Sequence, residues 1–129
     1  MQEILVLGAG KIGALISGLL AESGSYRVQL ADAMPGVANS VAEAHRLDAI
    51  SAFDLDASDT EALTRHVREH KPAALVSSLP YFCNVGVAEV ARAEGLHYFD
   101  LTEDVAVTAA VRSIAEGAST AFVPQSGLA

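Results

Sequence analysis

The stretch ILVLGAGKIG, residues 4–13, decides the fold of this chain. An apolar run ends in Gly-x-Gly-x-x-Gly and a segment with helical spacing follows, which is the context of a dinucleotide-binding turn. Gly8 lets the chain turn as it leaves the strand, Gly10 keeps side chains away from a pyrophosphate, and Gly13 lets the helix pack closely. The start of the helix then offers N–H groups and the positive end of its dipole to phosphates.

The composition limits the class of protein. The chain has 129 residues, 51% hydrophobic and 19% charged, which predicts one globular domain. A net charge of −8 argues against nucleic acid or an anionic membrane as a partner. The single Cys83 excludes an internal disulfide, and the chain begins without the basic start of a signal peptide. We therefore expect a cytoplasmic protein.

Short apolar strands alternate with helices along the chain. We expect strands over residues 3–7, 26–31, 49–53, 73–77, 96–100 and 120–123. We expect helices over residues 11–23, 35–46, 84–94 and 103–116, and one from Ser58 or Asp59 to His70. In the first helix, one face carries apolar side chains at helical spacing: Ile12, Leu15, Ile16, Leu19 and Leu20.

This alternation predicts an α/β fold. We expect a Rossmann-type, doubly wound parallel sheet of about six strands in a three-layer α/β/α sandwich. The expected strand order is 3-2-1-4-5-6, with a ligand crevice outside the carboxyl ends of strands one and four. Residues 1–129 would form one dinucleotide-binding domain, and we expect it to be an N-terminal fragment that lacks its substrate domain.

Asp32 is the candidate ribose ligand. It ends the second predicted strand, nineteen residues after Gly13. A carboxylate there can accept hydrogen bonds from the adenosine ribose and would repel a 2′-phosphate. No arginine follows, since the next residues are Ala33 and Met34. The cofactor is therefore predicted to be NAD, with NADP less favoured; a merely solvated or helix-capping aspartate is the alternative.

Two further loops border the predicted crevice. Asp56 and Ala57 follow strand three, where a carboxylate could meet the adenine amino group or simply solvate a turn. Residues 77–80, Ser-Ser-Leu-Pro, follow strand four and would pass the cofactor's ribose and nicotinamide, with a plain strand-to-helix turn as the alternative. No metal site is expected, because His66 and His70 have no third ligand at suitable spacing. No general acid or base stands out.

Three stretches together carry a family resemblance. They are VLGAGKIG, SSLPYFCNVGVAEVARAEGLHYFDLTED and the terminal VPQSGLA. The chain resembles the N-terminal cofactor domain of the saccharopine dehydrogenase-like family. The family's features include Asp56-Ala57, Leu79-Pro80, the Tyr98-x-Asp100 segment and the start of a Gly-x-x-Pro-Gly-like turn at residues 127–129. A cysteine often found before the last glycine is Ser126 here.

The resemblance implies an NAD(P)-dependent oxidoreductase acting at the CH–NH bond of an amino acid or polyamine-like substrate, such as saccharopine, lysine or carboxynorspermidine. The pyrophosphate would be bound by Gly8, Ala9, Gly10, Lys11, Ile12 and Gly13. The remaining cofactor contacts would come from Asp32, Ala33, Asp56, Ala57, Ser77, Ser78, Leu79 and Pro80. We expect the isolated chain to bind NAD(H) without turnover, and a homodimer is possible.

Two other classes of protein compete with this interpretation. A regulatory nucleotide-sensing domain of a potassium channel or transporter shares the glycine turn and the acid after strand two. Its loop after strand four tends to be acidic and threonine-rich, whereas this chain has Ser-Ser-Leu-Pro. A short-chain or epimerase-like enzyme would need a Tyr-x-x-x-Lys pair, and none of the three tyrosines has a lysine four residues on.

Overall fold

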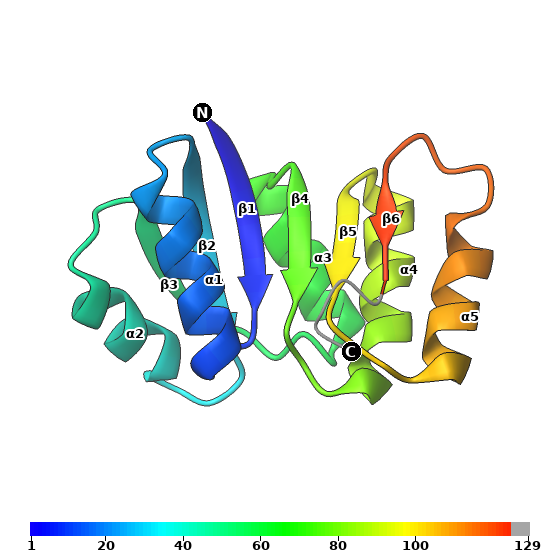
Figure 1. The fold of residues 1–129 in the computed structure, drawn as a ribbon, viewed down its shortest axis with the longest axis horizontal. Helices are drawn as coiled ribbons and strands as arrows, with labels where there is room; N and C mark the ends of the chain where they lie inside the picture. Colours follow the sequence, from blue (N-terminus) through cyan, green and yellow to red (C-terminus); the bar gives the residue numbers. More distant parts are fainter. Residues whose placement is uncertain (125–129) are drawn as a thin grey trace.

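A computed structural model describes residues 1–124 of the chain. Six parallel strands form one sheet in the order β3-β2-β1-β4-β5-β6, which confirms the predicted order (Figure 1). The strands are β1 (Gln2–Leu7), β2 (Tyr26–Asp32), β3 (Ile50–Asp54), β4 (Ala74–Ser77), β5 (His97–Asp100) and β6 (Phe122–Val123). The helices are α1 (Lys11–Glu22), α2 (Val37–His45), α3 (Thr60–His70), the 3₁₀ turn η1 (Tyr81–Cys83), α4 (Asn84–Glu94) and α5 (Val105–Ala115).

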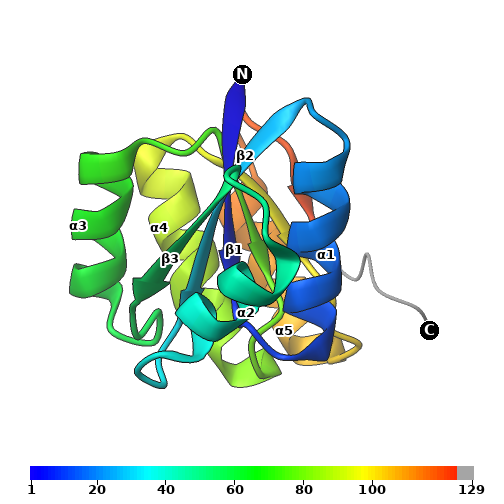
Figure 2. The same ribbon diagram turned by 90° about the vertical axis from the view of Figure 1, so that its left-hand side faces the viewer.

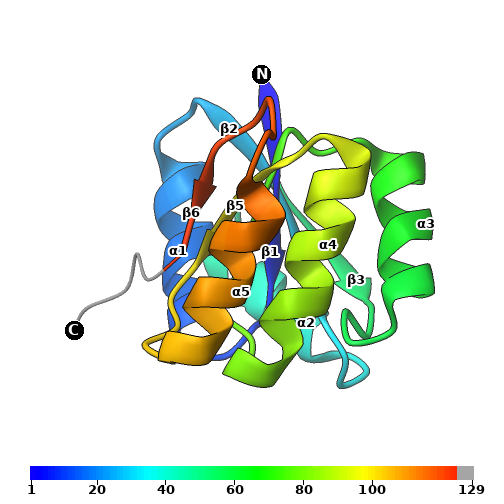
Figure 3. The same cartoon turned by 90° about the vertical axis from the view of Figure 1, so that its right-hand side faces the viewer.

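The helices form two layers around the sheet, as Figures 2 and 3 show from its two edges. α1 and α2 cover one face, and α3, α4 and α5 cover the other. Successive side chains of a strand point to opposite faces, so β1 supplies Leu5 and Leu7 to one core and Ile4 and Val6 to the other. The predicted three-layer sandwich is confirmed.

The two helix layers differ in extent. In Figure 1, α1 and α2 lie on the side of β2 and β3, while β1 and the half of the sheet formed by β4, β5 and β6 remain in view. Within residues 1–124, no helix covers that second half of the sheet on the α1 side. Parallel sheets are ordinarily buried on both faces, so this half-face is an unusual surface for the fold.

Local sequence sets where the helices begin and end. Asp59 begins α3 as predicted, because its side chain accepts hydrogen bonds from the N–H groups of Glu61 and Ala62. α5 begins two residues later than predicted, because Asp104 caps it through Val107 N–H. Gly95 ends α4 in the left-handed conformation, with φ of 72°, which glycine adopts without strain.

The orientation of α1 differs from its apolar periodicity. The face packed in the interior carries the small residues Gly13, Ser17, Gly18 and Ala21. The large side chains Ile12, Leu15 and Leu19 are instead 52%, 56% and 60% exposed. Close packing explains the choice, because a Cβ added at Gly18 would lie 2.7 Å from the His45 ring. The small face thus brings α1 close to its neighbours and turns a large apolar face outward.

Candidate dinucleotide-binding site

The glycine turn joins β1 to α1 at the carboxyl edge of the sheet. Gly8 has a φ of +95°, a conformation that L side chains rarely adopt. Gly10 is the N-cap residue of α1; no side chain caps the helix, and no acidic residue lies in its first turn. The first-turn N–H groups have no intrahelical acceptor, so they are available to a ligand anion.

A side chain added at each of the three glycines of the turn would meet different surroundings. A Cβ at Gly13 would lie 1.7 Å from the carbonyl oxygen of Gly8, so only glycine allows α1 to start this close to the turn. A Cβ at Gly8 would lie 2.7 Å from Ser78 Oγ. A Cβ at Gly10 would meet no protein atom within 4 Å. Gly8 and Gly13 are therefore required by the fold, whereas the space in front of Gly10 is open to a ligand.

Ser78 connects the glycine turn to the loop after β4. Its Oγ lies 2.8 Å from the carbonyl oxygen of Leu7 and 3.1 Å from that of Gly8. Its backbone N–H also donates to Leu7, at 2.9 Å. The two loops that flank the predicted crevice are thereby held against each other at the point where the strand order reverses.

Asp32 lies at the end of β2, beside the glycine turn. Its Oδ2 accepts a hydrogen bond of 2.8 Å from Ala9 N–H, and its Oδ1 accepts one of 2.9 Å from Met34 N–H. The carboxylate is half-buried, and Ala33 next to it is exposed. The structure therefore places the candidate ribose ligand and the candidate pyrophosphate turn in direct contact.

The loop after β3 lies next to β2 at the same edge. Leu55 N–H donates to the Asp32 carbonyl at 2.9 Å, which fixes the start of this loop. Asp56 is exposed, and its carboxylate accepts hydrogen bonds from the side chain and backbone of Ser58, which hold its pKa below the usual value. Ala57 is buried in the core beneath α3 and α4. Within the protein, Asp56 thus makes the contacts of a turn residue, which is the alternative that the sequence left open for it.

The two serines after β4 point in different directions. Ser77 is buried, and its Oγ donates to Asn84 Oδ1 at 2.6 Å, away from the glycine turn. Ser78 faces the turn. Sequence reasoning grouped these serines and missed Asn84, a buried residue at the start of α4. The alternation of strand side chains could have separated the serines, but nothing local in the sequence identified Asn84 as their partner.

The rest of this loop lies at the rim of the sheet. Leu79 packs against the core on the side of α4, while Pro80 is exposed. Tyr81 and Phe82 follow in η1 and are 54% and 70% exposed, with their rings in edge contact. The loop therefore presents apolar and aromatic surface beside the predicted path of the cofactor.

The end of β5 carries a buried polar pair that sequence reasoning did not assign to the site. Tyr98 OH donates to Asp100 Oδ2 at 2.6 Å, and both residues are fully buried. Burial and the neighbouring Asp100 raise the pKa of Tyr98. Asp100 is paired in register with Ser77, so this carboxylate lies at the carboxyl edge, next to β4.

The described residues show a binding site more clearly than a reaction centre. Burial and the charge of Asp56 raise the pKa of the Cys83 thiol, which disfavours a reactive thiolate. Within residues 1–124, no group of three His, Cys, Asp or Glu side chains could hold a metal ion. No helix in that part of the chain could cross a membrane. The uncapped helix start, the open space at Gly10 and the carboxylate of Asp32 together fit a dinucleotide.

Comparison with known proteins agrees with this fit. Residues 4–123 match the family described as the saccharopine dehydrogenase NADP binding domain. The chain belongs to this family. It is a nicotinamide dinucleotide-binding domain of the oxidoreductase type, as the resemblance of its loops predicted. The predicted features at residues 125–129, including Ser126 and the final turn, lie outside the described residues.

Solved structures place this family member among dehydrogenases by fold. Saccharopine dehydrogenase (L-Glu forming) from Saccharomyces cerevisiae superposes with a TM-score of 0.85 at 19% identity, over 99% of this chain and 28% of that one. The WlbA dehydrogenase from Chromobacterium violaceum, in complex with NADH and UDP-GlcNAcA, superposes with a TM-score of 0.75 at 12% identity. The match covers 95% of this chain and 34% of that one. The enzyme WbmG from Bordetella bronchiseptica, in complex with NAD and UDP, superposes with a TM-score of 0.69 at 14% identity. The match covers 94% of this chain and 51% of that one.

These likenesses concern the fold. The chain matches 28%, 34% and 51% of the lengths of the saccharopine dehydrogenase, WlbA and WbmG chains. No protein of curated function matches the sequence.

Proposed function

We propose that this chain is the NAD-binding domain of a saccharopine dehydrogenase-like oxidoreductase that acts at the CH–NH bond of an amino acid or polyamine-like substrate. The observation that carries the proposal is the junction of Asp32 with the glycine turn. The junction combines an uncapped helix start, open space at Gly10 and a fixed carboxylate at one edge of the sheet. Polypeptide outside these 129 residues would hold the substrate.

Each part of the cofactor has a candidate contact at this edge. The pyrophosphate would lie on the backbone of residues 8–13, and the adenosine ribose on Asp32 and Ala33. The loop at Asp56 and Ala57 would border the adenine, and the loop at residues 77–80 the nicotinamide half. When bound, the cofactor supplies the hydride chemistry, and this domain binds and orients it.

The preference for NAD over NADP rests on charge. A 2′-phosphate on the adenosine ribose would lie against the Asp32 carboxylate, which is held in place by Ala9 and Met34. Residues 33–36, Ala-Met-Pro-Gly, offer no positive charge to offset the repulsion. The description of the matching family names NADP, so the proposed preference for NAD sets this chain apart from that description.

The domain on its own is expected to bind without catalysing. Hydride transfer requires a substrate carbon fixed against the nicotinamide, and the described residues assign no general acid or base to that task. A reducing compartment such as the cytoplasm suits the single Cys83, whose burial raises its thiol pKa.

Calorimetric titration with NAD and with NADP tests this proposal. Wild type is expected to bind NAD at least about tenfold more tightly, which corresponds to about 1.4 kcal/mol. Asp32→Asn should reduce that ratio by improving NADP binding. The matched control is Asp54→Asn, because Asp54 ends the neighbouring strand and accepts a hydrogen bond from Gly36 N–H at 3.0 Å. Tighter NADP binding by wild type would overturn the preference, and binding of neither dinucleotide would overturn the site.

A further inference from the structure

The peptide bond between Gly8 and Ala9 is hydrogen-bonded on both of its sides. Its N–H group donates to Asp32 Oδ2 at 2.8 Å, and its carbonyl oxygen, on Gly8, accepts from Ser78 Oγ at 3.1 Å. In a trans peptide these two groups point in opposite directions, so the two side chains hold the peptide plane from opposite sides. Asp32 ends β2 and Ser78 follows β4, and these strands flank β1. The pair is called the peptide clamp below.

The hydroxyl group of Ser78 fills a notch that two glycines leave open. A Cβ at Gly8 would lie 2.7 Å from Ser78 Oγ, and a Cβ at Gly13 would lie 2.9 Å from it. The same hydroxyl lies 2.8 Å from the carbonyl oxygen of Leu7, so its one hydrogen atom is shared between two carbonyl groups of the turn. Because that hydrogen atom is committed to the turn, Ser78 has none left to donate to the cofactor.

The turn depends on other elements to fix this peptide. Residues 8–10, Gly-Ala-Gly, carry only one methyl side chain, and Ala9 packs it into the core. Gly8 has a φ of +95° and lacks the steric restraint that a Cβ imposes. A rotated peptide plane would turn the Gly8 carbonyl oxygen toward the Asp32 carboxylate, where two acceptors repel each other. Asp32 therefore selects one orientation of the peptide, and Ser78 supplies the donor that this orientation needs.

We propose that Ser78 is a positioning residue for dinucleotide binding and that it acts through the Gly8–Ala9 peptide. This inference rests on the proposed function, because it assigns the pyrophosphate to the same turn. Since Ala9 N–H donates to Asp32, the N–H groups left for the pyrophosphate are those at the start of α1, in residues 10–13. Ser78 sets the direction in which the chain enters that helix, and thus the direction of these N–H groups.

The shared peptide makes Ser78 and Asp32 interdependent. Without Ser78, the Gly8 carbonyl group loses its donor and the peptide can rotate, which weakens the bond from Ala9 to Asp32. Without Asp32, the orientation that Ser78 holds no longer serves a partner. Residues that act through one shared group have non-additive effects. A serine that bonded the cofactor directly would instead add its effect to that of Asp32 and leave the unliganded turn unchanged.

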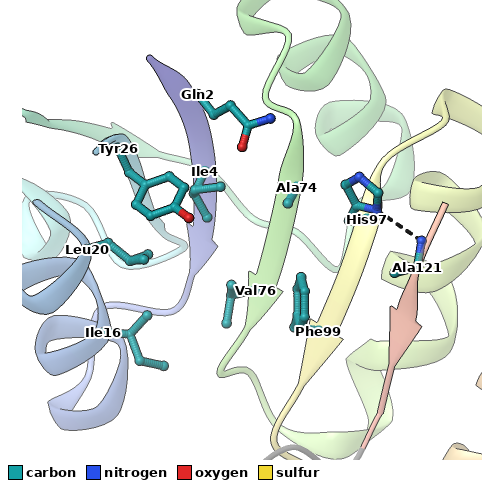
Figure 4. Close-up of a pocket in the computed structure, with 10 residues that line it drawn as sticks. All are labelled: Gln2, Ile4, Ile16, Leu20, Tyr26, Ala74, Val76, His97, Phe99 and Ala121. Atoms are coloured by element: carbon teal, nitrogen blue, oxygen red, sulfur yellow. Dashed lines mark hydrogen bonds between the residues drawn. The ribbon is translucent and has the colours of Figure 1, made fainter. Parts of the chain in front are cut away.

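The peptide clamp is separate from the hollow on the α1 side of the sheet. Figure 4 shows that hollow, a cavity of about 490 Å³ over β1, β4 and β5. Among the described residues, those that line it include no member of the glycine turn and neither Asp32 nor Ser78. A substitution of Ser78 therefore changes the turn and leaves the apolar lining of the cavity in place.

Amide hydrogen exchange of the unliganded protein tests the peptide clamp directly. In Ser78→Ala, the Ala9 amide should exchange at least about tenfold faster than in wild type, relative to the amides of β1, which report global unfolding. Ser23→Ala is the matched control, because Ser23 Oγ also donates to a backbone carbonyl group, that of Leu20, at 2.7 Å near the other end of α1. The control should keep the wild-type rate at Ala9. An unchanged Ala9 rate in Ser78→Ala would overturn the proposal.

A double-mutant cycle with NAD tests how Ser78 acts. Calorimetric titration compares wild type, Ser78→Ala, Asp32→Ala and the double variant. Ser78→Ala should bind NAD at least about fivefold more weakly than wild type. The loss in the double variant should be at least about threefold smaller than the product of the two single losses. Losses that simply multiply would show that Ser78 acts independently of Asp32 and would overturn the proposal, as would wild-type NAD affinity in Ser78→Ala.

The two measurements separate this inference from the proposed function. If wild type binds no dinucleotide, the proposed function fails and the role of Ser78 in binding fails with it. The exchange rate of Ala9 does not depend on any ligand, so it still shows whether Ser78 holds the peptide. If wild type binds NAD and the Ala9 rate is unchanged in Ser78→Ala, the proposed function stands and the inference alone is wrong.

Discussion

The carboxylate of Asp32 accepts a hydrogen bond of 2.8 Å from the backbone N–H of Ala9, so the end of β2 and the glycine turn form one unit. The second carboxylate oxygen accepts from Met34 N–H and fixes the loop that follows β2. The Asp32 carboxylate therefore does not have to move toward the turn when a cofactor binds. A side chain that is already held in its binding position avoids the free-energy cost of being ordered on binding.

Replacing Asp32 by alanine tests the structural part of this relationship. Asp32→Ala removes an acceptor from two backbone N–H groups, and hydrogen bonds to a charged group contribute about 1.5–3 kcal/mol each in other proteins. Since the site is half-exposed and water can replace the lost acceptor, we expect the free energy of unfolding to fall by about 1–2 kcal/mol in a urea titration. Asp48→Ala, an exposed carboxylate after α2, should change it by less than about 0.5 kcal/mol. Equal effects of the two substitutions would contradict the assigned contacts.

The contact of Gly13 with Gly8 predicts a large loss of stability. In Gly13→Ala, the new methyl group would lie 1.7 Å from the Gly8 carbonyl oxygen, a separation that the backbone must change to relieve. We expect destabilisation of about 3 kcal/mol or more, measured as a lower urea midpoint, because displacing α1 also disturbs its packing. A wild-type midpoint in this variant would show that α1 does not start against the turn.

His66 predicts a loss of stability in mild acid. Its ring is buried, donates to Gln29 Oε1 at 2.9 Å and contacts Phe53 and His70. Burial, followed by the charge of His70, lowers the pKa of His66 from 6.5 to about 4, and the charge of Glu69 opposes this. Because the unfolded chain takes up a proton at a higher pH than the folded one, stability is complete above pH 6.5 and falls as the pH drops toward 4.

The loss attributable to His66 should reach about 2 kcal/mol at pH 5, since each unit of pKa difference corresponds to about 1.4 kcal/mol. Urea titrations of wild type and His66→Gln at pH 7.5 and pH 5 measure it. The substitution keeps a hydrogen-bond donor for Gln29 and removes the titration, so the variant should lose less stability than wild type over this interval. Parallel losses in both proteins would assign the pH dependence to other groups.

The sequence predicts most of this fold because local signals agree with the global pattern. The glycine turn, the strand–helix alternation and the N-cap at Asp59 each depend on neighbouring residues alone. The inward face of α1 does not. Large apolar residues at helical spacing indicated one face, but the contact of Gly13 with Gly8 and of Gly18 with His45 selected another. Such choices depend on how closely two elements approach, which periodicity does not encode.

The same limit applies to the site. The position of Asp32 after the second strand was predictable from spacing, and the structure places it against the glycine turn. Its bond to Ala9 depends on the exact path of the turn. The separate directions of Ser77 and Ser78 depend on where β4 ends, and Asn84 is the partner of Ser77 only because α4 starts above it.

The most direct test of the central claim is calorimetric titration of wild type and Gly10→Ala with NAD, together with thermal unfolding of both. A methyl group at Gly10 would meet no protein atom within 4 Å, and the φ of −73° suits alanine, so the variant should unfold at the wild-type temperature. It should bind NAD at least about tenfold more weakly, because the methyl group occupies the space proposed for the pyrophosphate. Unchanged NAD affinity in a stably folded Gly10→Ala would contradict the claim that the cofactor lies on this turn.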